Sequence, residues 1–224
     1  MVSIIGKNGI GKSTLLRTIA NMQASASGTV SINNIPLKSY RSLDLASVLS
    51  VVLTDPLASK NLTVQELIAL GRQPYTNWIG TLSTTDNNKI REAMALVELM
   101  ELKDKKCYEL SDGQLQRVMI ARALAQDTMI ILLDEPTSHL DLHHKVQILK
   151  LLKSIAHKTG KTILFTSHEI DMVIQLCDKI LLMNPEQHEY GKPEALIQKG
   201  SFEKLFPTNA IRFDKDSGSF KIQM

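Results

Sequence analysis

Short apolar runs alternate with segments of helical periodicity along most of this 224-residue chain. The apolar runs, which predict strands, are Val2–Ile5, Thr29–Ile32, Val48–Leu53, Met129–Leu133, Thr162–Thr166 and Lys179–Met183. The periodic segments, which predict helices, are Lys12–Met22, Val64–Leu70, Asn87–Met100, Ser111–Ala125, His143–Ala156 and Glu169–Leu176. Strands that alternate with helices favour a mostly parallel sheet flanked by helices, so we expect an α/β fold.

Two regions depart from this alternation. From Thr63 to about Lys105 the pattern is helical only, and the turn-rich, aromatic stretch Gly71–Trp78 interrupts it. Near the end of the chain, Ile211–Ile222 surrounds the turn residues Asp216-Ser217-Gly218 and predicts a hairpin.

The overall composition excludes several classes of protein. Hydrophobic residues make up 43% and charged residues 22%, as in an average globular protein, and the net charge of +3 is too small to indicate binding to nucleic acid or to an anionic membrane surface. The two cysteines, Cys107 and Cys177, are far apart and favour reduced cytosolic thiols. No apolar run approaches the ~20 residues of a membrane span, and no signal peptide is evident, so we expect any role at a membrane to depend on another chain.

The strongest chemical motif is a glycine-rich loop between the first predicted strand and the first predicted helix. It reads Gly6-Lys7-Asn8-Gly9-Ile10-Gly11-Lys12-Ser13 and is followed by Thr14. Its glycines let the backbone amides approach phosphate oxygens, and the next helix directs its positive end at the same place. In this pattern Lys12 reaches the β- and γ-phosphates and Ser13 binds Mg²⁺. An ordinary glycine-rich turn is the alternative, which the strand–loop–helix context disfavours.

A second motif places two acids at the end of a buried strand. The run Ile130–Leu133 is followed by Asp134 and Glu135, at the edge where α/β sheets bind ligands. Asp134 is the candidate Mg²⁺ ligand, and Glu135 is the candidate base that orients or deprotonates the attacking water. Structural capping by the two acids is the alternative, which their place after a phosphate loop disfavours.

A third segment, Leu110–Arg117, contains Ser111-Asp112-Gly113-Gln114. Together with the phosphate loop and the two strand acids, it resembles the signature sequence of ABC ATPases. The resemblance implies that Ser111, Gly113 and Gln114 contact the ATP that an opposite subunit binds. A serine-capped helix is the simpler interpretation of this segment, and the two are compatible.

Two shorter matches to the same family follow in the expected order. Ser138-His139-Leu140-Asp141 resembles the loop that communicates between the two nucleotide sites, with Asp141 as its matching residue. Thr166-Ser167-His168 resembles the end of the strand that carries the family's switch histidine, which makes His168 a catalytic candidate beside Glu135. His143 and His144 are adjacent, and we expect them to be solvated surface residues.

The chain departs from the family pattern in three places. Thr54 stands where the family has a glutamine, and its hydroxyl is a further candidate ligand of Mg²⁺. Asp112 replaces a glycine of the signature, where an acid favours the helix N-terminus but repels a nearby phosphate. The family also has an upstream segment with two strands and an adenine-stacking aromatic residue. We therefore expect Met1 not to be the true start, and Val2–Ile5 to have unpaired backbone and exposed apolar surface.

One stretch suggests a subfamily. Leu70–Trp78, taken with Thr54 and Gly200–Phe206, resembles the ATPases of importers for iron–siderophore complexes, haem or vitamin B12. In the family, the region between Thr54 and the signature docks on the membrane permease. An ordinary helical hairpin with a partly exposed core is the alternative interpretation.

The resemblance covers essentially the whole chain. It implies a P-loop NTPase domain over residues 1–224, with a mostly parallel sheet flanked by helices and an inserted helical subdomain at 56–126. It further implies ATP and Mg²⁺ as cofactors and a homodimer that hydrolyses ATP. The dimer would sit at the cytoplasmic face of the plasma membrane with a permease and a substrate-binding protein, and without nucleic acid. Three alternatives remain open. The chain could be the ATPase of an ABC importer or exporter for another substrate, or a soluble ABC ATPase that takes no part in transport. It could also be a regulatory module that binds nucleotide without hydrolysing it.

Overall fold

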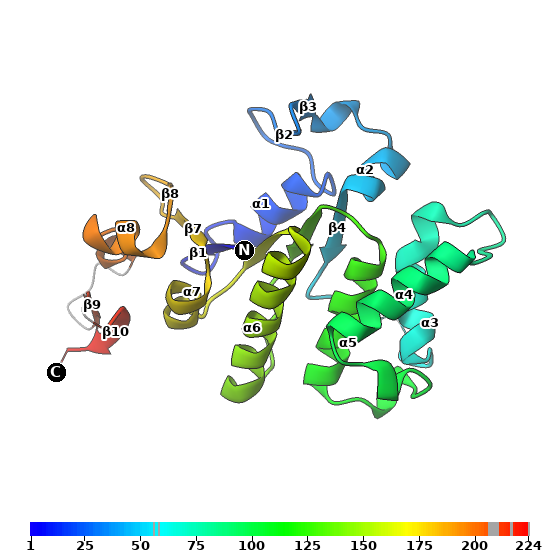
Figure 1. Cartoon of the computed structure of the whole chain (residues 1–224). Coiled ribbons are helices and arrows are strands. Elements are labelled where there is room, and N and C mark those ends of the chain that lie inside the picture. The colour runs from blue at the N-terminus through cyan, green and yellow to red at the C-terminus, as the bar shows by residue number, and fades with distance from the viewer. Residues whose placement is uncertain (56, 58, 206–210, 216, 224) are drawn as a thin grey trace.

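The computed structural model describes residues 1–55, 57, 59–205, 211–215 and 217–223 (Figure 1). A six-stranded sheet forms its centre, in the order β4-β5-β6-β1-β7-β8. The strands that run parallel to their neighbours are β4 (Leu49–Val52), β5 (Ile130–Leu133), β6 (Thr162–Thr166), β1 (Val2–Gly6) and β7 (Lys179–Met183). Only the short edge strand β8 (Glu189–Gly191) is antiparallel. The α/β fold with a mostly parallel sheet is confirmed.

Strand β1 lies inside the sheet. Its residue Val2 is opposite Leu164 of β6 on one edge and opposite Lys179 of β7 on the other. Ile4 and Ile5 are fully buried. The expected unpaired backbone and exposed apolar surface of this strand are therefore wrong, because two strands from much later in the chain occupy both of its edges.

Helices cover both faces of the sheet, as the continuous apolar strands predict. Adjacent residues of β5 show this directly: Leu132 packs in a cluster with Leu16 and Leu45, whereas Leu133 packs in the larger cluster with Ile148. The first cluster lies under α1 (Lys12–Ile19) and α2 (Ser42–Val48), and the second under α6 (Leu142–Thr159). The remaining helices around the sheet are α7 (Ile170–Leu176) and α8 (Pro193–Gln198).

A group of helices stands beside the sheet at its β4 side, drawn in cyan and green in Figure 1. It contains α3 (Val64–Ala69), the 3₁₀-helix η2 (Leu70–Tyr75), α4 (Thr84–Leu96) and α5 (Asp112–Ala125). Each α-helix of the group begins with a capping box, at Thr63, Ser83 and Ser111. The cap at Ser83 explains why α4 begins before Asn87. The boundaries 56 and 126 stay a prediction, and residues 56 and 58 lie outside the described part.

Several short elements differ from the predicted pattern. Instead of joining the main sheet, Thr29–Ile32 supplies only β2 (Ser31–Ile32), which pairs with β3 (Ile35–Pro36) across Asn33 and Asn34. Both asparagines have positive φ, 51° and 64°, as a tight hairpin turn requires. The sequence pattern did not predict α2, β8 or α8. The other 3₁₀ helices are η1 (Leu37–Ser39), η3 (Met100–Leu102), η4 (Cys107–Glu109) and η5 (Glu203–Leu205).

The predicted C-terminal hairpin is present. Strand β9 (Ile211–Asp214) pairs antiparallel with β10 (Ser219–Ile222). Its turn residue Asp216, like Phe206 of the subfamily motif, lies outside the described residues. Among the helices that the structure describes, none has the length and apolar character needed to cross a membrane.

Candidate functional site

The glycine-rich loop connects the end of β1 to the start of α1, near the middle of the sheet. A Cβ atom at Gly6 would lie 2.6 Å from the carbonyl oxygen of Met183, so only glycine fits where the strand turns. Gly11 has a φ of 103° and precedes a helix without a side-chain cap. The first-turn amides of α1 are therefore left to bind an anion, as the sequence predicts for a phosphate loop.

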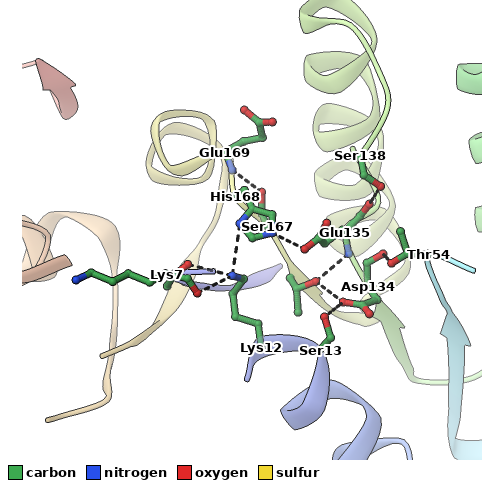
Figure 2. A network of polar contacts seen from close by, with 12 residues as sticks. Lys7, Lys12, Ser13, Thr54, Asp134, Glu135, Ser138, Ser167, His168 and Glu169 are labelled. Carbon is green, nitrogen blue, oxygen red and sulfur yellow. Dashed lines mark hydrogen bonds and ion pairs between the residues drawn. The ribbon is translucent and has the colours of Figure 1, made fainter. Parts of the chain in front are cut away.

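Lys12 is buried and folds back over this loop. Its Nζ donates hydrogen bonds to the carbonyl oxygens of Gly6 at 3.0 Å and Lys7 at 3.2 Å, and lies 3.4 Å from His168 Nδ1 (Figure 2). Burial lowers the pKa of Lys12, and the negative charges of Glu135 and Asp134 oppose that shift. The ammonium group thus lies among the loop carbonyls, where it can exchange these partners for phosphate oxygens.

Asp134 follows β5 and faces the first turn of α1. The Ser13 hydroxyl donates a hydrogen bond of 2.8 Å to Asp134 Oδ1, and the Thr54 hydroxyl donates one of 3.1 Å to the Asp134 carbonyl oxygen. A serine hydroxyl beside a carboxylate is the oxygen set that Mg²⁺ prefers, together with substrate phosphates. Ser13 and Asp134 therefore fit the ion. The Thr54 hydroxyl is bonded to the main chain, so its part in binding the ion stays a prediction.

Glu135 has an uncommon backbone conformation, with a φ of 46° in the left-handed region. Such a conformation in a residue other than glycine costs on the order of 1–3 kcal/mol and persists only where neighbours hold it. The Ser138 hydroxyl donates a hydrogen bond of 2.8 Å to the Glu135 carbonyl oxygen, and the carboxylate pairs with His168 Nε2. The two residues proposed for catalysis thus lie in direct contact, beside Lys12.

Thr166, at the end of β6, is a site residue that the sequence analysis missed. Its buried hydroxyl donates a hydrogen bond of 2.7 Å to Asp134 Oδ1 and accepts one of 2.8 Å from the Glu135 main-chain amide. The sequence does show a hydroxyl residue at the end of the strand predicted at Thr162–Thr166. That residue can be placed beside Asp134 and Glu135 only when β5 and β6 are known to be neighbours in the sheet, which the sequence does not state.

The signature segment forms the N-terminus of α5. Ser111 caps the helix: its hydroxyl accepts a hydrogen bond of 3.3 Å from the Gln114 amide, and the Gln114 side chain accepts one of 3.1 Å from the Ser111 amide. Asp112 is exposed in the first turn, where a negative charge suits the helix dipole. Among the described residues, no hydrogen bond joins Ser111, Gly113 or Gln114 to the network of Figure 2.

Asp141 caps α6 and contacts a histidine that the sequence analysis assigned to the solvated surface. Asp141 Oδ1 accepts a hydrogen bond of 2.9 Å from the His144 amide, and Oδ2 lies 2.8 Å from His144 Nδ1. These bonds lower the pKa of Asp141. His143 is exposed as expected, but the His144 side chain is only 45% exposed and also contacts Gly113.

Comparison with known proteins identifies a family. Residues 1–138 match the family model described as ABC transporter. The chain is also 34% identical, over 203 residues, to the petrobactin import ATP-binding protein FpuD of Bacillus anthracis. That match covers 90% of this chain and 74% of the relative.

Two solved structures are similar to the whole fold. One is an inward-facing, putative metal-chelate type ABC transporter: it has a TM-score of 0.80 and 26% identity, and the match covers 99% of this chain and 83% of that chain. The other is a dimeric ATP-binding cassette in a post-hydrolysis state bound to ADP and Pi. It has a TM-score of 0.71 and 30% identity, and the match covers 86% of this chain and 85% of that chain.

Proposed function

The chain belongs to the ABC transporter family as an ATP-binding subunit with ATPase activity, and from this we propose that two copies hydrolyse Mg·ATP between them to drive a separate permease. We further propose that the permease imports an iron–siderophore-type complex. The first proposal rests on one observation: the predicted site residues lie in two separate places in the structure. Lys12, Asp134 and Glu135 lie in one network, whereas the signature segment lies on a separate helix, where Ser111 and Asp112 are exposed.

Within one subunit, each residue of the network has a chemical task. Lys12 and the free amides of α1 hold the β- and γ-phosphates. Ser13 and Asp134 would hold Mg²⁺, which neutralises charge on these phosphates when it is bound. Glu135 orients and deprotonates the attacking water, and His168 holds the Glu135 carboxylate in place. Phosphoryl transfer depends mainly on such positioning and charge stabilisation, so this set of residues suffices on its side of the site.

The second copy completes the site. The N-terminus of α5, where Ser111 is exposed, offers the Ser111 hydroxyl, with Gly113 and Gln114 next to it in the chain, to the γ-phosphate held by the partner. Asp141 connects the two sites. ATP then forms part of the interface, so hydrolysis loosens the dimer. The dimeric cassette bound to ADP and Pi, whose match covers 86% of this chain, supports the formation of a dimer.

A groove beside the helical group is suited to a permease helix. It has a volume of about 750 Å³ and lies between α2, η2 and α5. Polar and apolar residues line it, and three of the apolar ones are open to solvent: Leu43 is 66%, Leu70 50% and Trp78 95% exposed. Exposed apolar patches of this kind mark protein interfaces. We propose that a cytoplasmic helix of the permease occupies the groove and keeps this chain at the cytoplasmic face of the membrane.

The substrate class follows from the relatives. A petrobactin import ATP-binding protein and a putative metal-chelate type transporter both match this chain over most of its length. A metal chelate of the siderophore type, delivered by a substrate-binding protein, is therefore the proposed cargo. Vesicles that contain the permease, with this chain and ATP inside and the substrate-binding protein outside, should accumulate a radiolabelled ferric siderophore. Vesicles with Glu135→Gln should not, and ATP-independent uptake would contradict the proposal.

Mixed dimers test the shared site directly. Ser111→Arg should leave ATP binding by the isolated subunit intact and block hydrolysis, because the altered residue serves the partner's ATP. A dimer of one Ser111→Arg subunit and one Lys12→Ala subunit retains one intact composite site and should hydrolyse ATP. An inactive mixed dimer, or a Ser111→Arg homodimer that hydrolyses ATP at the wild-type rate, would contradict the shared arrangement.

Trp78→Ser tests the groove. It should weaken co-purification with the permease while leaving the ATPase activity of the isolated chain unchanged, since Trp78 lies outside the catalytic network. Tyr190→Ser, which alters an exposed aromatic residue on β8, is the matched control. Equal recovery of the permease with both variants would remove the groove from the proposal.

A further inference from the structure

His144 connects the two segments that the proposed dimer presents to the partner's ATP. It lies in the first turn of α6, directly after the Asp141 loop, and its ring lies against the first turn of α5 at Gly113. A methyl group added at Gly113 would come within 3.0 Å of His144 Cδ2 and 3.4 Å of Cγ. An alanine at this position of the signature would therefore require the ring to shift by a few tenths of an ångström.

The same histidine fixes both oxygens of the Asp141 carboxylate. Its main-chain amide is bonded to Oδ1 at 2.9 Å, and its Nδ1 lies 2.8 Å from Oδ2. An Asp side chain that only capped the helix would need the first of these bonds alone. The second bond adds a constraint on the rotation of the carboxylate, and it comes from the residue that also touches Gly113.

One helical turn further on, α5 and α6 are connected again. Arg117 Nη2 donates a hydrogen bond of 3.3 Å to the Gln147 side-chain oxygen. Arg117 follows Gly113 by four positions and Gln147 follows His144 by three, so each pair shares one face of its helix. The contact between His144 and Gly113 is thus the end of a longer contact between the two helices.

The backbone conformation of Gly113 does not itself require a glycine. Its φ is not among the positive values found at other glycines of the described chain, so an alanine could adopt the same backbone conformation. The neighbouring ring leaves little room for a side chain at this position.

We infer that His144 is a positioning residue. It fixes the position of the loop that ends at Asp141 relative to the first turn of α5 at Gly113, so that both segments reach the partner's ATP together. The inference rests on the proposed dimer. The two segments come from different parts of the chain, and the His144 side chain contacts both. A loss of this contact should leave each segment folded but misplaced relative to the other.

A double-variant experiment tests the contact by ATPase activity. Gly113→Ala should lower kcat by up to ~100-fold, the cost that a displacement of about 1 Å can have, with the ATP affinity of the isolated subunit unchanged. Adding His144→Ala should recover part of that loss, because it removes the ring that the new methyl group meets. A double variant no more active than Gly113→Ala would overturn the inference.

Single variants separate the contact from simple folding defects. His144→Asn keeps a donor for Asp141 and should be more active than His144→Ala. His188→Ala alters an exposed histidine outside α5 and α6 and should match wild type. Thermal unfolding midpoints should be alike for all variants. If His144→Asn and His144→Ala are equally impaired, or if neither is impaired, the inference is wrong.

Measurements of dimerisation separate a failure of this inference from a failure of the proposed function. In a Glu135→Gln background, ATP should drive dimer formation that analytical ultracentrifugation detects, and His144→Ala should weaken it about tenfold, equivalent to ~1.4 kcal/mol. An ATP-driven dimer that His144→Ala leaves equally tight overturns only the role of His144. The absence of any ATP-driven dimer in the parent refutes the proposed shared site, and the role of His144 with it.

Discussion

The main-chain amide of Glu135 donates a hydrogen bond of 2.8 Å to the hydroxyl of Thr166. The bond joins the ends of two neighbouring strands, β5 and β6, at the point where Glu135 takes up its left-handed conformation. Because the same hydroxyl donates to Asp134, one side chain orients both acids of the site. The positions of the two acids therefore depend on a residue that need not touch the nucleotide.

Thr166→Val should lower kcat while ATP binding is retained. Valine has nearly the shape of threonine, so the strand should persist, but both hydrogen bonds are lost and the acids can move. A displacement of about 1 Å can cost ~100-fold in rate, which sets the upper limit of the expected loss. Steady-state ATPase assays measure it. Thr162→Val at the exposed start of β6 is the matched control, and equal activity of the two variants would contradict the role of Thr166.

Glu135→Gln should preserve ATP binding and reduce turnover by ~10²–10⁴, the usual contribution of a general base. The amide keeps the size of the side chain but cannot accept the proton of the attacking water. Single-turnover hydrolysis of ATP and equilibrium binding of a fluorescent ATP analogue separate the two effects. A near wild-type rate would show that another group serves as the base.

Lys12→Ala should abolish tight ATP binding, because it removes the charge that faces the β- and γ-phosphates. Titration with a fluorescent ATP analogue measures the affinity. Lys158→Ala, at the exposed C-terminal end of α6, makes the same change in net charge away from the loop and should bind as wild type does. Unchanged affinity in Lys12→Ala would refute the assignment of the phosphate loop.

Asp86→Ala should destabilise the helical group without acting on the nucleotide site directly. Asp86 accepts a hydrogen bond of 2.8 Å from Arg72 Nε, and both side chains are buried. Loss of one partner leaves a buried charge, which costs about 3 kcal/mol. Urea unfolding measures the free energy. Asp44→Ala, which breaks the exposed pair of Asp44 with Arg41, should have a far smaller effect.

The contribution of Asp86 should also depend on pH. Hydrogen bonds from Ser83 and then the interaction with Arg72 lower the pKa of Asp86 from its ordinary value of 3.8. A carboxyl group with a lowered pKa stabilises the fold fully above that ordinary value, and the stabilisation is lost as the pH falls through the lower folded value. The difference in unfolding free energy between wild type and Asp86→Ala should therefore narrow below pH 3.8. A difference that stays constant to lower pH would contradict this.

The sequence alone was sufficient for features that depend on neighbouring residues. The phosphate loop needs only a strand, closely spaced glycines and a helix in succession, and Gly6–Ser13 carries that information locally. The same holds for the cap at Ser111 and for the acids that end β5. The strand–helix alternation also predicted the α/β fold, because strands that are buried on both faces are apolar throughout.

The tertiary structure was needed for contacts between residues far apart in the chain. The pairing of β1 with β6 and β7, the place of Thr166 beside Glu135, and the contact of His144 with Gly113 all depend on which elements become neighbours. The hydrophobic pattern predicts that a residue is buried, but it does not predict which residues it packs against, since burial is favourable with any apolar partner. Partners are selected by the packing of the whole domain, so a hydroxyl or an imidazole gains its role only when that packing is complete.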